Sequence, residues 1–203
     1  MDLQDDDGYA ALMLAAVNGH VEMAGLLLKA GADMDVQNIP DGHTALMLAA
    51  WNGQVEVARL LLELFADTKW RDDEGHTALL LAAKKGHVEI ARLLLEAGAD
   101  KDLQNGNGCT ALMLAAWNGQ VEMAQLLLEA GADVDLQDDD GYAALMLAAV
   151  NGHVEMAGLL LEAGANKDLH DHYSVTTTAL MLAEERGHSE VATLLLSKGS
   201  QDG

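Results

Sequence analysis

The chain has 203 residues, 50% of them hydrophobic and 3% aromatic, and its 33 acidic and 11 basic side chains give a formal net charge of −22. Such a charge repels phosphate backbones and anionic lipid headgroups, which argues against nucleic acid or a membrane as partner; it keeps the protein soluble and could also steer a basic partner. No apolar run reaches about 18 residues, and a lone Cys109 allows no intramolecular disulfide, so we expect a cytoplasmic protein.

An internal repeat organises the rest of the sequence. Residues 2–28 recur letter for letter at 135–161, and related segments lie between them with a period of 33 residues. A unit of this length cannot bury its own apolar face, so copies must stack. The sequence therefore predicts a single solenoid over residues 1–203. Its six repeats are expected at about 1–40, 41–73, 74–106, 107–139, 140–173 and 174–203.

Within a copy, the pattern predicts two short helices and one projecting turn, here called the finger. In the second copy, Thr44 is a good N-cap for a helix over 45–50, which Gly53 ends. Residues 55–62 follow with apolar side chains at helical spacing. A polar turn such as 138–141 then forms the next finger. The fold class is therefore all-α.

Some copies depart from this pattern. Ala10 and Ala143 stand where other copies have a capping threonine, and the segment 63–66 lacks the glycine that ends the second helix elsewhere. The finger of the second copy gains one residue at Ile39–Pro40, and the sixth copy has about two extra residues within 172–175. Both insertions fall in turns, where a solenoid tolerates them.

The start of the first helix reads Thr-Ala-Leu-Met at 44–47 and 110–113, and Ala-Ala-Leu-Met at 10–13 and 143–146. With the 33-residue period over essentially the whole chain, this pattern resembles the ankyrin repeat family, as a natural tandem duplication or a designed protein. The resemblance implies an ankyrin-type solenoid of stacked helix-turn-helix repeats with hairpin-like fingers. The family usually has Thr-Pro-Leu-His here, and its histidine supports hydrogen bonds between units. Methionine is expected to replace that polar support with packing.

The remaining chemical groups favour structural roles. Histidine follows the glycine between the two helices in four copies, but Gln54 and Gln120 take its place in two others, so we expect a hydrogen-bonding role and no titration. The acidic and histidine residues of 168–172 favour a solvated loop over a weak metal site. Cys109 has no catalytic partner, and no nucleophile or phosphate-loop motif is present. We expect no enzyme, no metal and no cofactor.

Binding of another protein, whose identity the sequence does not reveal, is the function that remains. Positions that vary between copies while the scaffold stays constant are the candidates for recognition, and by resemblance they would line a concave strip. These residues are Tyr9, His43, Trp51, Asn52, His76, Lys84, Lys85, Trp117, Asn118, Tyr142 and Asn151. Aromatic and cationic side chains are common interface anchors. Two tryptophans flanking two lysines would suit apolar anchors around an acidic centre; packing of both tryptophans on neighbouring helices is the alternative.

A structural assembly unit is the alternative function. The first copy is almost identical to the fifth, an interior copy, and so should expose an apolar outer face that stacks on another copy or on an adjoining domain. The last copy instead introduces Glu184, Glu185 and Arg186 and resembles a polar cap. Self-association through the first repeat is the expectation that separates this alternative from partner binding.

Overall fold

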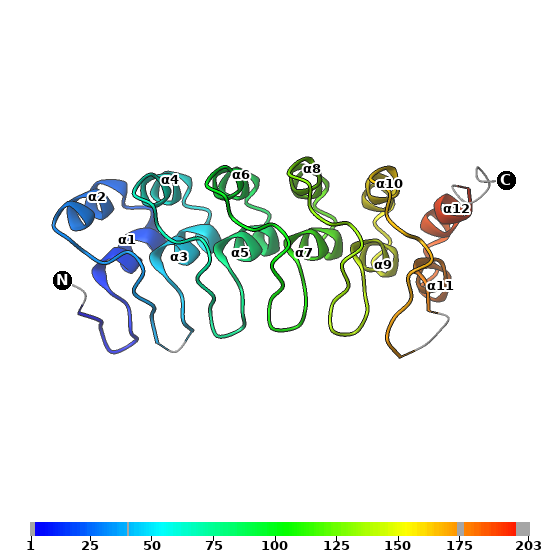
Figure 1. Ribbon diagram of the computed structural model, residues 1–203, viewed down its shortest axis with the longest axis horizontal. Coiled ribbons are helices and arrows are strands. Elements are labelled where there is room, and N and C mark those ends of the chain that lie inside the picture. Colours follow the sequence, from blue (N-terminus) through cyan, green and yellow to red (C-terminus); the bar gives the residue numbers. More distant parts are fainter. Residues whose placement is uncertain (1–2, 40, 174–176, 198–203) are drawn as a thin grey trace. The chain divides into compact units, whose positions relative to one another are not determined.

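The computed structural model describes residues 3–39, 41–173 and 177–197, so Pro40 and residues 174–175 of the insertion expected within 172–175 lie outside the described part. Over the described ranges the chain forms twelve helices and two isolated β-bridges, which confirms the all-α class (Figure 1). The helices are α1 Ala11–Asn18, α2 Val21–Lys29, α3 Ala45–Asn52, α4 Val55–Glu63, α5 Ala78–Lys85, α6 Val88–Glu96, α7 Ala111–Trp117, α8 Val121–Glu129, α9 Ala144–Val150, α10 Val154–Glu162, α11 Ala179–Glu185 and α12 Ser189–Ser197.

The chain divides into two compact units, residues 1–106 and 107–203, and the division falls at the predicted start of the fourth repeat. In the first unit, α1, α3 and α5 pack in one row, and α2, α4 and α6 pack in a second row (Figure 1). In the second unit, α9 packs between α7 and α11, and α10 between α8 and α12. Each unit is therefore a stack of helix-turn-helix repeats. The single solenoid over 1–203 stays a prediction.

The core of each repeat comes from both of its helices. In the second repeat, Leu46 and Met47 of α3 and Leu61 of α4 are almost fully buried, and Ala49 and Ala58 are completely buried. Full burial of a leucine contributes about 1.5 to 3 kcal/mol. The alanines let neighbouring helices approach closely, because a larger side chain would hold the backbones apart. Packing on the next repeat therefore supplies most of the stability.

In both units, the residue just before a second helix also forms a side-chain hydrogen bond to the preceding repeat. Its imidazole or amide nitrogen lies near a carbonyl at the end of the preceding first helix. The pairs are His87 with Trp51 at 3.3 Å, Gln54 with Val17 at 3.1 Å, His153 with Trp117 at 3.1 Å and His188 with Val150 at 3.1 Å. A carbonyl can only accept, so each imidazole Nε2 carries its proton. The hydrogen-bonding role predicted from the histidine-to-glutamine exchange is confirmed.

Neighbouring fingers are held by single backbone hydrogen bonds. The amide of Asp73 donates to the Asp41 carbonyl at 3.1 Å, and the amide of Gly106 donates to the Glu74 carbonyl at 2.8 Å. Gly75 between them has φ of +79°, and a Cβ there would lie 2.7 Å from the Gly106 nitrogen. Glycine is therefore required at this turn for conformation and for the close approach of the next finger.

The methionine at the third helical position does more than pack. The Met47 sulfur accepts a hydrogen bond from the Thr44 amide at 3.5 Å, while the Thr44 hydroxyl accepts one from the Met47 amide at 3.3 Å. Thr110 and Met113 form the same reciprocal pair. The expectation of packing alone was therefore incomplete, because the thioether is a weak acceptor in the place that a polar residue takes in a capping box.

The N-caps of α1 and α9 generate a first prediction. Ala10 and Ala143 have the extended backbone of an N-cap but no side-chain hydrogen bond. Ala10→Thr and Ala143→Thr should each raise the free energy of unfolding by about 0.5 to 2 kcal/mol, measured by urea denaturation, because the new hydroxyl accepts from a helix-start amide. The control is Ala143→Val, which has threonine's shape without the hydroxyl. An equal gain from valine would contradict the capping explanation.

The loop after α4 generates a second prediction. Phe65 has φ of +64° and is exposed, whereas Gly98 and Gly131 hold the corresponding place with φ of +84° and +79°. A left-handed backbone costs a non-glycine residue about 1 to 2 kcal/mol, part of which is offset by the more restricted unfolded chain. Phe65→Gly should therefore stabilise the protein by about 0.5 to 1 kcal/mol. Phe65→Ala keeps the strain, and thermal unfolding of both variants should show a gain for glycine alone.

Candidate functional site

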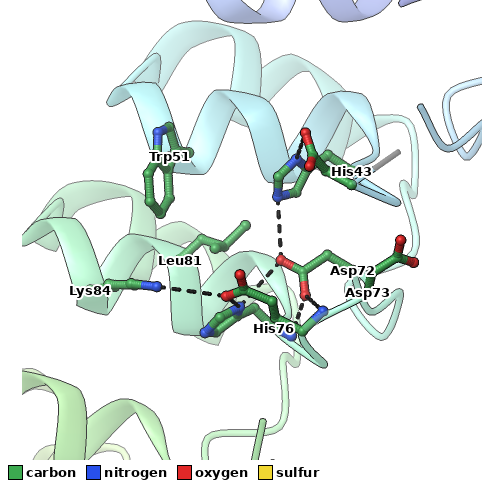
Figure 2. Close-up of a pocket in the computed structure, with 9 residues that line it drawn as sticks. His43, Trp51, Asp72, Asp73, His76, Leu81 and Lys84 are labelled. Carbon is green, nitrogen blue, oxygen red and sulfur yellow. Dashed lines mark hydrogen bonds and ion pairs between the residues drawn. The ribbon is translucent and has the colours of Figure 1, made fainter. Parts of the chain in front are cut away.

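A pocket of about 220 Å³ opens in the first unit between the fingers that precede α3 and α5. One wall carries His43 and Trp51 from the second repeat, and the other carries residues of the third repeat (Figure 2). The complete lining is Asp41, His43, Trp51, Asp72, Asp73, Glu74, His76, Leu81 and Lys84. Four of the eleven residues predicted from sequence for recognition therefore share one pocket: His43, Trp51, His76 and Lys84.

Asp72 is the centre of this pocket. Its buried carboxylate accepts hydrogen bonds from the amides of Glu74 at 3.0 Å and His76 at 2.7 Å through Oδ1. Its Oδ2 lies 3.3 Å from His43 Nε2 and 3.3 Å from His76 Nδ1 (Figure 2). Two backbone amides and two imidazoles replace the water that this carboxylate lost on burial. The carboxylate therefore fixes both histidines across the gap between two repeats.

His76 is bound on both ring nitrogens. Its Nδ1 lies 3.3 Å from the Asp72 carboxylate and 3.4 Å from the Glu74 carboxylate, and its Nε2 lies 3.2 Å from Asn105 Nδ2. A carboxylate accepts and an amide nitrogen donates, so this arrangement corresponds to the neutral tautomer with its proton on Nδ1. His76 is buried and has no ring nitrogen left to offer a partner.

Trp51 and the two lysines of α5 form a second cluster beside the pocket. Lys85 Nζ lies 3.7 Å from the centre of the Trp51 ring, and Lys84 Nζ lies 5.6 Å from it. Lys84 also pairs with Glu74 at 3.9 Å. Both ammonium groups therefore already have intramolecular partners, and the half-buried Trp51 takes part in packing between repeats. This weakens the expectation that the lysines receive an acidic partner.

The predicted asparagines share a local role. Each Nδ2 donates to the carbonyl four residues earlier in its own first helix, which satisfies an acceptor at the helix end. The bonds are Asn52 to Leu48 at 2.8 Å, Asn118 to Leu114 at 2.8 Å and Asn151 to Leu147 at 2.9 Å. Their part in recognition stays a prediction, and the amide nitrogen of each side chain already donates a hydrogen bond within its own helix.

The other predicted residues lie outside the pocket. Tyr9 is half-buried in the first finger, and its amide donates to the Asp5 carboxylate. In the second unit, the side chain of Trp117 is exposed by 52%. Tyr142 is half-buried, and burial followed by the nearby Asp171 raises the pKa of its phenol. Trp117 is therefore the most accessible aromatic residue of the predicted set.

Sequence reasoning missed the acidic lining of the pocket: Asp41, Asp72, Asp73 and Glu74. Asp or Asn occupies the place of Asp72 in every copy, and its oxygen closes the turn of the finger. The carboxylates of Asp5 and Asp138 bond their own turn amides in the same way. That constancy indicated a scaffold role. Asp72 also binds two imidazoles, because the second copy places His43 on one side of it and the third copy places His76 on the other.

Two findings bear on ligands and membranes. Within residues 3–39, 41–173 and 177–197, no three His, Cys, Asp or Glu side chains are grouped to hold a metal ion, including those of 168–172. In the same ranges no helix has the length and apolar character needed to cross a membrane.

The finger before α7 generates a third prediction. Burial, then Asp138, Asp139 and Asp140, raise the pKa of the Cys109 thiol from 9.0 to about 11. Because the thiolate is the nucleophile, alkylation by iodoacetamide at pH 8 should be about 100-fold slower than for a thiol of pKa 9.0. Asp138→Asn should lower the pKa and speed the reaction. The pH profile of the rate checks this, and a midpoint near 9 in the folded protein would contradict it.

Comparisons with known proteins agree with this architecture. A family model described as ankyrin repeats (3 copies) matches residues 1–72, 63–138 and 130–202. The chain is also similar to the crystal structure of an ankyrin repeat domain from Acinetobacter baumannii AYE, with 34% sequence identity and a TM-score of 0.85. That match covers 93% of this chain and 97% of the other. The chain therefore belongs to the ankyrin repeat family.

Proposed function

We propose that this protein is a non-catalytic interaction module that holds a protein partner on its fingers and first helices. Ankyrin repeats are generally protein–protein interaction modules, and the family match runs from residue 1 to residue 202. The pocket between the second and third fingers is the observation that carries the proposal. Its lining includes His43, Trp51, His76 and Lys84, which belong to the set of residues that vary between copies.

A division of labour within the repeat supports this location. Side chains outside the predicted recognition set tie repeats together: His87 bonds the preceding repeat, and Gln37 and Arg71 donate to the backbone carbonyls of Arg71 and Gln104, respectively, in the following repeats, each at 2.9 Å. These side chains are occupied within the fold. Among the variable residues, His43, Trp51 and His76 also contact the neighbouring repeat, whereas Trp117 is exposed by 52%. Recognition is therefore assigned to the variable set.

The charges around the pocket favour a basic partner. Asp41, Asp73 and Glu74 are exposed at its edge, and the only lysine in its lining, Lys84, pairs with Glu74. The whole chain carries a net charge of −22, which would steer a basic surface toward it. Lysine or arginine side chains of the partner would pair with these carboxylates, while Trp117 offers an apolar anchor. The single cysteine is consistent with a reducing, intracellular location for this binding.

Substitutions in a purified complex test the proposal. The partner is first captured from a lysate of the source organism on the immobilised protein and identified by mass spectrometry. Trp117→Ala should then weaken binding by about 2 kcal/mol, roughly thirtyfold in Kd, with an unchanged Tm because the side chain is largely exposed. The double variant Asp41→Asn/Asp73→Asn should reduce both the affinity and its salt dependence.

Two controls separate binding from folding. Phe65→Ala removes an exposed aromatic residue that belongs to neither a finger nor a first helix, and it should leave Kd unchanged. Trp51→Ala should lower both Tm and affinity, because its ring also packs against Lys85. Wild-type affinity in both Trp117→Ala and the double aspartate variant would show that the partner binds elsewhere.

A further inference from the structure

The outer face of the first repeat is apolar and exposed. Leu14 of α1 is exposed by 44% and Met23 of α2 by 53%. Val21, Met23 and Leu26 are among the residues that line a shallow depression of about 480 Å³ on this face. We call the surface formed by Leu14, Val21, Met23 and Leu26 the N-face. Buried leucines and methionines are the rule in the other repeats, so the N-face lacks a cover that they have.

An identical sequence inside the chain shows what covers such a face. Residues 135–161 repeat 2–28 without a change, so Leu147 corresponds to Leu14 and Met156 to Met23. Leu147 is exposed by only 7% and Met156 by 0%. The difference comes from the fourth repeat, because α9 packs on α7 and α10 packs on α8. The same side chains are therefore buried wherever a repeat like the fourth lies against them.

The opposite end of the chain does not offer this cover. Met181 in α11 is exposed by 47%, whereas its counterpart Met146 is exposed by 1%, so Met181 marks the side that a following repeat would cover. Glu184 lies three residues further on the same side of α11, where the fourth repeat has the buried Ala116. Stacking this end on an N-face would bury that carboxylate. Two copies of net charge −22 would also repel each other.

We propose that the N-face is a docking surface for an ankyrin-type repeat whose outward side has the chemistry of α7 and α8. The partner repeat presents leucine and methionine at its centre and an alanine at the place of Ala116. It binds as the fourth repeat binds the fifth, helix row against helix row. This surface is separate from the finger pocket, and the inference does not depend on the proposed function.

A full-length probe tests this docking. In the probe, residues 179–197 are exchanged for the sequence of 111–129, which has the same length and restores the outward side of the fourth repeat. Met23→Glu and Leu26→Glu close the N-face of the probe itself, so that it cannot polymerise. Mixed with the native chain, the probe should form a 1:1 complex in sedimentation velocity, while each protein alone sediments as a monomer.

Variants of the native chain supply the controls. Met23→Glu/Leu26→Glu in the native chain should weaken the complex at least about tenfold, because charged side chains would be buried against the probe. Leu196→Glu, an equally exposed leucine in α12, should leave the complex unchanged. Circular dichroism shows whether the exchanged helices fold. If they do not, a second probe keeps the native helices and carries the substitution of the exposed Glu184→Ala together with Met23→Glu and Leu26→Glu.

Three outcomes would overturn the proposal. A folded probe that forms no complex would show that the N-face does not accept such a repeat. A complex that survives Met23→Glu/Leu26→Glu in the native chain would place the contact elsewhere. If the native chain dimerises alone and the same double substitution abolishes this dimer, the occupant of the N-face is a second copy of the chain. None of these results bears on the finger pocket, so failure here is distinct from failure of the proposed function.

Discussion

The structure depends on one constraint: a single repeat cannot bury its own apolar face. Ala49 and Ala58 have no exposed surface because the helices around them approach to the distance that only a methyl group allows. That approach is repeated from copy to copy, so the stability of each repeat is largely an interface energy with its neighbours. Two segments of identical sequence therefore differ in burial according to the neighbour alone.

Stacking also creates a polar requirement that the constant residues meet. Each first helix ends in carbonyls without a partner in the helix, and at α1, α3, α7 and α9 the next repeat brings a donor to one of them. The imidazole of His87 and the amide of Gln54 serve equally well, because only an N–H donor within hydrogen-bond distance of the carbonyl is needed. At the other end of the helix, a hydroxyl and a thioether satisfy the cap of α3. Little of the constant surface is left for a partner.

Aspartates cluster in the fingers, and the chemistry of each finger follows from how its carboxylates are accommodated. Asp72 is buried but surrounded by amide and imidazole donors, which compensate for its lost hydration. Cys109 lies in the next finger along the sequence, where partial burial and nearby aspartates both disfavour a thiolate. At the edge of the pocket, Asp41 and Asp73 are exposed, and the exposed Glu74 pairs with Lys84.

The sequence by itself determined the helices, most of their caps and the role of the histidines after the interhelix glycine, because these follow from local patterns that recur along the chain. Only the tertiary structure decided that His43, Asp72 and His76 meet in one pocket and that Lys85 covers Trp51. These contacts join residues of adjacent repeats. They depend on how closely two fingers approach and on which rotamer each side chain adopts, and neither quantity is encoded in the periodicity of the repeat.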